Sequence, residues 1–358
     1  MTTSMHRVAV VGAAGYSGAE LVAILLSHPA VELAGLFGSE RRGAGSDAER
    51  FDSLHPRFRG ATELRVEAAD PAAILAQRPA AVFLATPHEA SEALAPRLLE
   101  EGVVVFDLSA AFRLRDAAAY PAHYGFSHGH PELLKSAAYG LPELHAEAIA
   151  DATLIACPGC YPTSVILPMR PLAESGVLAA DEPIIVDAAS GVSGAGRTAA
   201  VKSLFCEVSF QPYGVFSHRH QPEMEQETGR PILFTPHLLP LDRGILSTIH
   251  ARLAPGASID DARACLEERY AGQPFVRILP RGQWPSIAGV ERTNLCDIAL
   301  GCDRSGRHLV VASAIDNLLK GAAGQAVQCF NVRFGLPQQT ALGPEWAARK
   351  GVAAWMDR

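Results

Sequence analysis

The residues best suited to covalent chemistry stand in residues 156–164, which read ACPGCYPTS. Cys160 follows a short apolar run, and Pro162 suits the first turn of a helix that runs to about Ser175. A thiol at a helix N-terminus ionises readily, because the positive end of the helix dipole stabilises the thiolate. Backbone N–H groups of the same turn could hold an oxyanion. The segment therefore predicts an activated nucleophile at Cys160.

The spacing Cys157-x-x-Cys160 leaves three other interpretations open. A redox dithiol has the same spacing, although no thioredoxin-like pattern surrounds this one. Half of a zinc site is a second interpretation, but no second ligand pair is evident. The third is that both cysteines are buried structural residues.

A histidine pair offers the base that a thiol nucleophile needs. Residues 217–225 read SHRHQPEME, and the step from Gln221 to Pro222 favours a helix start directly after His220. His218 shares a face with His220 if the segment is extended. The alternative is two ordinary surface histidines.

The other histidines form only a loose cluster of His123, His128 and His130, with no carboxylate at ligand spacing. We therefore predict no metal site.

A glycine-rich loop lies between a predicted strand and a predicted helix, and its candidate cofactor-binding residues are Gly12, Gly15, Tyr16, Ser17 and Gly18. Glycine permits a tight turn there, and the following helix N-terminus attracts a pyrophosphate. The spacing is G-x-x-G-x-x-G instead of the usual G-x-G-x-x-G, and an ordinary turn is the competing interpretation.

The end of the second predicted strand bears on the choice of dinucleotide. Ser39 and Arg41, or Arg42, could hold a 2′-phosphate, which favours NADP(H), whereas Glu40 would favour NAD. Solvated loop charges are the alternative.

Two more loops follow predicted strands, where ligands bind in such sheets. One contributes the cofactor candidates Ser190, Gly191, Ser193 and Gly194. The other contributes the substrate candidates Ser109 and Arg113, the latter as an anion clamp.

Strand and helix patterns alternate in the first half, which predicts a parallel α/β sheet. Expected strands there are residues 7–11, 31–37, 81–85, 103–108 and 153–156, with helices at 18–27 and 88–101. The second half carries longer strands and few helices, so we expect a mixed or antiparallel sheet of an α+β domain. Its expected strands are 183–189, 231–234, 244–253, 293–300 and 308–315, with helices at 260–270 and 317–330. Gly321 and Gly324 weaken the last helix unless something packs close to it.

Composition excludes several classes of protein. The 358 residues suggest about two domains, and 48% hydrophobic residues exclude wholesale disorder. A net charge of −7 without a basic stripe argues against nucleic-acid binding. Seven cysteines without framework spacing favour a reducing compartment. Residues 152–169 are uncharged but contain three prolines, so we expect no membrane span and a cytoplasmic protein.

Taken together, these segments resemble N-acetyl-γ-glutamyl-phosphate reductases of arginine biosynthesis, which are related to the aspartate-semialdehyde dehydrogenases. The resemblance runs from Val8 to about Gly335. It is carried by the ordered stretches GAAGYSGAEL, FLATPHE, DLSAAFRL, YGLPEL, PGCYPTS, SGVSGAGR, HRHQPEMEQE, FTPHLLPLDRGIL, CDIAL and SAIDNLLKGAAGQAVQ.

The resemblance implies NADPH-dependent reduction of an acyl phosphate to an aldehyde through a cysteine thioester. Cys160 stands at the family's nucleophile position and His220 at the acid/base position, with His218 and Glu223 as substrate-binding candidates and Asn317 near the nicotinamide. This chain departs from the family pattern at Cys157, often Asn, and at residues 216–217, often two glycines.

The implied organisation is a Rossmann-type NADP-binding domain of residues 1–155 and 325–358, and a catalytic and oligomerisation domain of residues 156–324. We expect a homo-oligomer, either a dimer or a tetramer. The rival substrates are aspartyl phosphate and a carrier-bound N-acetylaminoadipyl phosphate. A non-catalytic NADP-sensing regulator is the rival from another class.

Overall fold

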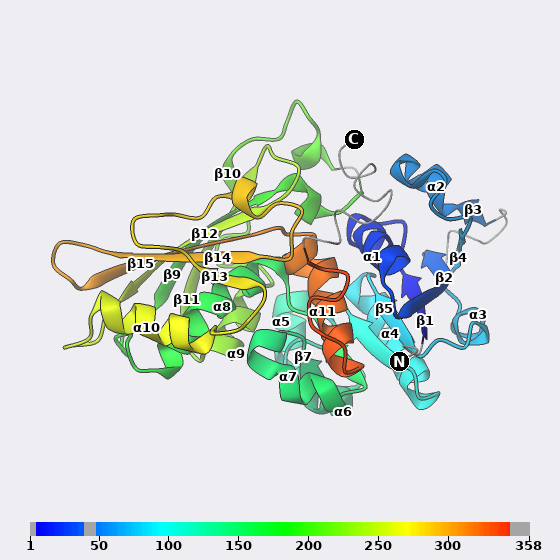
Figure 1. Cartoon of the computed structure of the whole chain (residues 1–358), viewed down its shortest axis with the longest axis horizontal. Helices are drawn as coiled ribbons and strands as arrows, with labels where there is room; N and C mark the ends of the chain where they lie inside the picture. The colour runs from blue at the N-terminus through cyan, green and yellow to red at the C-terminus, as the bar shows by residue number, and fades with distance from the viewer. Residues whose placement is uncertain (1–4, 39–47, 199, 344–358) are drawn as a thin grey trace. The chain divides into compact units, whose positions relative to one another are not determined.

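The computed structural model describes residues 5–38, 48–198 and 200–343 (Figure 1). The chain forms two compact units. Unit 1 comprises Met1–Ala117, Ser127–Pro158 and Ala322–Arg358, and unit 2 comprises Ala118–Phe126 and Gly159–Gly321. Residues 118–126, which the sequence analysis assigned to the first domain, thus group with unit 2.

Unit 1 is built on an eight-stranded sheet in the order β3-β4-β2-β1-β5-β6-β8-β7, parallel except for β3. The strands are β1 (His6–Val11), β2 (Val31–Gly38), β3 (Glu49–Arg50), β4 (Arg65–Ala68), β5 (Ala81–Leu84), β6 (Val104–Asp107), β7 (Ala138–Tyr139) and β8 (Leu154–Ala156). The helices are α1 (Tyr16–Ser27), α2 (Phe51–Leu54), α3 (Pro71–Ala76), α4 (His88–Glu100), α6 (Pro131–Ser136), α7 (Pro142–Asp151) and α11 (Gly324–Arg333). Every residue of β5 and β6 is buried, as in a parallel sheet whose two faces are both covered.

Unit 2 is built on a seven-stranded sheet in the order β10-β11-β9-β12-β15-β14-β13. The strands are β9 (Ile184–Gly191), β10 (Gln211–Pro212), β11 (Ile232–Leu239), β12 (Ile245–Arg252), β13 (Val276–Ile278), β14 (Cys296–Cys302) and β15 (His308–Ile315). The pairs β9/β11 and β13/β14 are parallel and the others antiparallel, so the sheet is mixed. This α/β and α+β combination is the predicted fold class.

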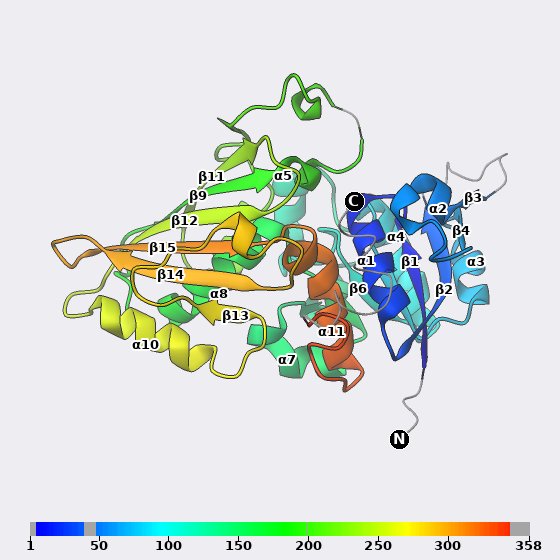
Figure 2. The ribbon, with the colours of Figure 1, turned by 45° about the horizontal axis from the view of Figure 1, so that its top comes forward.

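Helices cover one face of the unit 2 sheet. They are α8 (Cys160–Glu174), α9 (Gln221–Thr228) and α10 (Ile259–Arg269), and the short α5 (Tyr120–Tyr124) also belongs to this unit. Figures 1 and 2 show α8 and α10 on the same side of the strands. Along β9 and β11, buried side chains alternate with side chains that point to the opposite face of the sheet. On that opposite face Ile185 is 41% and Leu233 40% exposed. The helix-covered face therefore holds the core, and α8 runs within it.

Two of the expected elements lie at displaced positions, the strand expected at 231–234 is β11 and extends to Leu239, and short elements such as β4 were not expected. The helix expected from residue 317 is preceded by a π-helical turn at Leu319–Ala323, and α11 begins only at Gly324. The carboxylate of Asp316 caps this turn by accepting the N–H groups of Leu318 and Leu319. The N–H of Gly321 then donates to the carbonyl of Asp316, five residues earlier, so the turn is π-helical and not α-helical. The strand expected at 293–300 is β14, displaced toward the C-terminus because Thr293 closes a turn onto Val290.

Candidate active site

Cys160 is the first residue of α8, as the sequence predicts. Gly159 is the N-cap, with an extended backbone and no side chain to cover the helix end. The first turn closes where the N–H and Oγ1 of Thr163 both donate to the Gly159 carbonyl, at 2.9 and 3.0 Å. The half-buried Cys160 lines a pocket of about 280 Å³ within unit 2. The positive end of the α8 dipole stabilises a thiolate at Cys160, and the side chain borders the pocket, where a ligand can reach it.

His220 lies directly against the residue that precedes the cysteine. It is the N-cap of α9 and 7% exposed. A methyl group on Gly159 would lie 2.5 Å from the Nε2 atom of His220, so only glycine permits the imidazole to come this close. Cys160 and His220 line the same pocket. The structure thus brings together the two residues that the sequence analysis named as nucleophile and acid/base.

Glu223 connects the two segments that carry Cys160 and His220. Its side chain is fully buried in the first turn of α9, and Oε1 accepts the N–H of Gly159 at 2.9 Å. This geometry supports a positioning role for Glu223. Its predicted contact with substrate stays a prediction.

His218 packs beside His220, with ring centroids 4.8 Å apart, and it lines the same pocket. Its Nδ1 accepts the N–H of His220 at 3.2 Å, so the neutral ring carries its proton on Nε2. His218 therefore offers a donor to a ligand in the pocket, which is consistent with its predicted substrate-binding role.

Two tyrosines that the sequence analysis did not assign also line the pocket. The hydroxyls of Tyr161 and Tyr213 lie 3.1 Å apart, and that of Tyr161 also donates to the carbonyl of His237 at 3.2 Å. Burial raises the pKa of Tyr213 to about 12 and raises the pKa of Tyr161 further. Both phenols are neutral near pH 7. Tyr161 could have been found from its place beside Cys160, whereas no local pattern marks Tyr213.

The predicted cofactor loop after β9 reaches the same pocket. Ser190, Gly191 and Gly194 line it. Asn317 is buried, donates from Nδ2 to Ser193 Oγ at 3.0 Å and accepts the N–H of Gly244 through Oδ1. Asn317 thus holds this loop in place, and its contact with nicotinamide stays a prediction.

The glycine loop of unit 1 has the form of a dinucleotide-binding turn. Gly12 has φ +89°, and a methyl group there would lie 2.1 Å from the carbonyl oxygen of Ala85, just beyond β5. A methyl group on Gly18 would lie 2.2 Å from the Gly12 oxygen. Gly15, the N-cap of α1, would meet nothing nearer than 3.5 Å. The turn lies where β1 separates β2 from β5, the place at which such sheets bind ligands.

Tyr16 and Ser17 open α1, and Tyr16 is 41% exposed. The N-terminus of α1 has no side-chain cap, and an uncapped helix N-terminus attracts anions such as a pyrophosphate. The contact of these residues with a cofactor stays a prediction. Ser39 and Arg41, the candidates for a 2′-phosphate, lie outside the described residues.

Ser109 and Arg113, also in unit 1, hold the loop after β6. Ser109 donates to the buried carboxylate of Asp107 at 2.8 Å, and burial raises the pKa of Asp107. Arg113 is buried and donates through Nε to Cys157 O and through Nη2 to Leu108 O, both at 2.8 Å. The predicted anion clamp thus already binds backbone carbonyls, and its contact with a phosphate stays a prediction.

Metal and membrane features were searched in the part of the chain that the structure describes. No three His, Cys, Asp or Glu side chains lie close enough there to share a metal ion. Every helix in those residues is too short or too polar to cross a bilayer. None of the seven cysteines, Cys157 and Cys160 included, forms a disulfide bond.

Known protein families match both units. Residues 7–152 match the family model of the semialdehyde dehydrogenase NAD binding domain, and residues 160–317 that of the semialdehyde dehydrogenase dimerisation domain. Among solved structures, aspartate semialdehyde dehydrogenase II from Vibrio cholerae is similar with a TM-score of 0.68 and 20% identity, over 92% of this chain and 98% of that one. Aspartate semialdehyde dehydrogenase with NADP from Candida albicans gives a TM-score of 0.69 at 16% identity, over the same shares. At this identity the likeness shows the fold.

Curated relatives are much more similar in sequence. N-acetyl-gamma-glutamyl-phosphate reductase from Moritella profunda is 48% identical over 344 residues, 94% of this chain and 100% of that protein. The protein of that name from Escherichia coli O6:H1 is 46% identical over 339 residues, with the same coverage. The resemblance seen in the sequence is confirmed: this chain belongs to the N-acetyl-gamma-glutamyl-phosphate reductases, within the semialdehyde dehydrogenase family.

Proposed function

We propose that this protein reduces N-acetyl-γ-glutamyl phosphate with NADPH to N-acetyl-L-glutamate 5-semialdehyde and phosphate, a step of arginine biosynthesis. The observation that carries the proposal is the pocket of unit 2. There Cys160 begins a helix, and the imidazole of His220 lies against the adjacent Gly159. The close relatives named above support the choice of substrate.

The Cys160 thiolate attacks the acyl carbon. A C–S bond forms, the C–O bond to phosphate breaks, and phosphate leaves with the electron pair. NADPH, when bound, supplies the hydride that reduces this carbon, and the N-terminus of α1 with Gly12, Gly15 and Gly18 would hold its pyrophosphate. The N-terminal turn of α8 stabilises negative charge beside Cys160 at each stage.

Release of the aldehyde returns the thiol to its starting state. The C–S bond breaks, its electron pair stays on the sulfur, and the carbonyl re-forms. The alkoxide that hydride addition leaves on this carbon takes a proton from His220, and Nε2 takes that proton back as the C–S bond breaks, because this edge of the ring lies nearest to Gly159. General acid–base catalysis of this kind contributes typically about 10²–10⁴-fold.

The test is the reverse reaction, phosphate-dependent reduction of NADP⁺ with N-acetylglutamate semialdehyde. We expect Cys160→Ala to lose on the order of 10⁴–10⁶-fold in rate, as nucleophile replacements do. Cys302→Ala, at another half-buried cysteine in β14, is the matched control and keeps its activity. Turnover by Cys160→Ala would refute the assignment. Faster turnover of aspartate semialdehyde by the unaltered enzyme would refute the substrate.

The proposal includes a homodimer in the cytoplasm. Residues 160–317 match a dimerisation domain, and seven cysteines without a disulfide bond fit a reducing compartment. Light scattering after size exclusion should give twice the chain mass of 38.0 kDa. A mass of one or four chains would contradict the dimer.

A further inference from the structure

The backbone of Gly321 is in direct contact with the nucleophile. A methyl group on Gly321 would lie 2.7 Å from the Cβ and 3.2 Å from the Cα of Cys160. Carbon atoms that are not bonded prefer a separation of about 3.5–4.0 Å. Any side chain at residue 321 would therefore clash with Cys160 in its present position.

The π-helical turn at Leu319–Ala323 creates this approach. The N–H of Gly321 donates to the carbonyl of Asp316, five residues earlier, at 2.9 Å. Such turns are rare and occur frequently at functional sites. The sequence predicts that Gly321 and Gly324 weaken a helix unless something packs close to them, and the residue that packs against Gly321 is Cys160.

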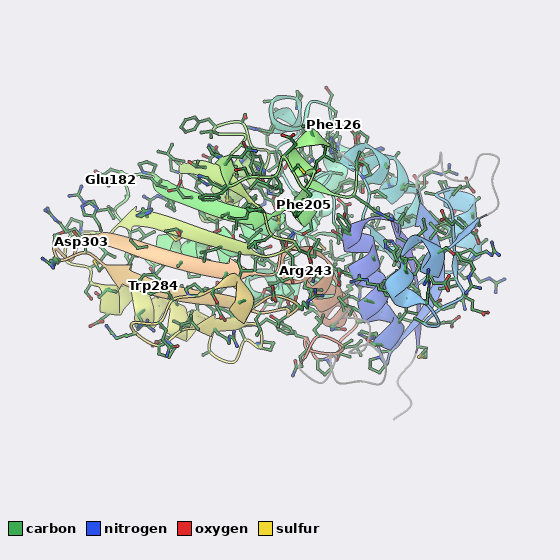
Figure 3. All side chains as sticks on the ribbon, turned by 90° about the horizontal axis from the view of Figure 1, so that it is seen from above. Phe126, Glu182, Phe205, Arg243, Trp284 and Asp303 are labelled. Atoms are coloured by element: carbon green, nitrogen blue, oxygen red, sulfur yellow. The ribbon has the colours of Figure 1, made fainter. Side chains whose placement is uncertain are left out.

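The π-helical turn is anchored by a buried carboxylate. Asp316 is fully buried, and its carboxylate accepts the N–H groups of Leu318, Leu319 and Arg292 at 2.8, 3.0 and 2.7 Å. It also binds the buried guanidinium of Arg243 at 3.1 Å. Figure 3 labels Arg243. Cys160, in contrast, borders the open pocket. Crowding at residue 321 will therefore displace the cysteine, because displacing the turn would break the bonds of a buried carboxylate.

We propose that Gly321 is a positioning residue for Cys160, and that the absence of a side chain at residue 321 sets the position of the thiol in the pocket. The inference rests on the proposed function, in which Cys160 is the nucleophile.

The first test separates catalysis from binding. A displacement of about 1 Å at a reacting atom can cost roughly 10²-fold, so we expect Gly321→Ala to lower kcat by about 10–100-fold. KM for NADP⁺ should stay within about twofold, because only the reacting atom moves. The pH midpoint of Cys160 alkylation by iodoacetamide should rise, since the thiol leaves its place at the N-terminus of α8. An unchanged kcat and alkylation profile would overturn the inference.

Gly301 provides a matched control. A methyl group there would lie 2.9 Å from the ring of Trp284, a side chain that is 52% exposed, in β14 and outside the pocket lining. Gly301→Ala should therefore keep kcat and the alkylation profile. The same losses in Gly301→Ala would show a general effect of crowding and overturn the inference.

The second test examines the contact without using catalysis. Cys160→Ala keeps the Cβ atom that Gly321→Ala would meet, whereas Cys160→Gly removes it. Gly321→Ala should therefore lower Tm in the Cys160→Ala background and lower it much less in the Cys160→Gly background. Equal losses in both backgrounds would overturn the inference. Activity of Cys160→Ala alone would refute the proposed function and leave this comparison valid.

Discussion

Replacing Glu223 with alanine removes the hydrogen bond between the start of α9, which carries His220, and the residue that precedes Cys160. Oε1 accepts the Gly159 N–H at 2.9 Å, and both residues are buried, so alanine leaves that N–H without this acceptor. An unsatisfied buried donor costs about 1–3 kcal/mol of unfolding free energy. The turn that carries Cys160 also becomes free to shift against His220, which should lower kcat by roughly 10–100-fold.

Glu223→Gln is the informative partner of this variant, because its amide oxygen still accepts the Gly159 N–H. We expect it to recover most of the stability and most of kcat, since a neutral oxygen still satisfies the buried N–H of Gly159. Urea unfolding at constant m-value and steady-state kinetics measure the two quantities.

The predicted role of Glu223 in substrate binding leads to the opposite pattern. In that case Glu223→Ala raises KM for the semialdehyde, while the urea midpoint and kcat stay unchanged. This result, or a Glu223→Gln variant as impaired as Glu223→Ala, would refute the positioning argument.

Three other perturbations follow from the backbone and from burial. Phe216 has φ +57° and is 72% exposed, so Phe216→Gly should raise the unfolding free energy by up to about 1 kcal/mol, and Phe216→Ala should not; equal melting temperatures of the two variants would contradict this. Gly12→Ala should destabilise the protein because its methyl meets Ala85 O, whereas Gly15→Ala should fold normally and weaken NADPH binding measured by fluorescence; unchanged NADPH affinity in Gly15→Ala would remove the pyrophosphate from this turn. Burial raises the pKa of Tyr213 to about 12, above its unfolded value of about 10, so its contribution to stability is complete below pH 10 and is lost as the pH rises through 12. Phenolate absorbance should show a titration near pH 12 that Tyr213→Phe removes, and an unchanged titration would contradict the burial argument.

Local patterns predicted the residues whose positions depend on neighbours in the sequence. Pro162 marks the first turn after Cys160, and Gln221-Pro222 marks the helix that follows His220. Alternating strands and helices predicted the parallel sheet of unit 1, because the period of the apolar residues differs between the two elements. Short charged strands such as β4 were missed, because four residues give too little of that pattern.

Residues whose roles depend on tertiary contacts could not be predicted in this way. Tyr213 reaches the pocket only because β10 pairs with β11, and Gly321 meets Cys160 only through a π-helical turn. Arg113 has the chemistry of an anion clamp, but the sequence does not show that backbone carbonyls occupy two of its donors. In each case the chemistry is visible in the residue type, and the partner lies far away in the sequence.

The central claim is that Cys160 carries the acyl group during turnover, and mass spectrometry of the quenched enzyme tests it most directly. Incubation with N-acetylglutamate semialdehyde and NADP⁺ in the absence of phosphate should accumulate an N-acetylglutamyl thioester on the peptide that contains Cys160. Added phosphate should discharge it. An acyl group on another residue, or full turnover with Cys160 unmodified throughout, would contradict the account.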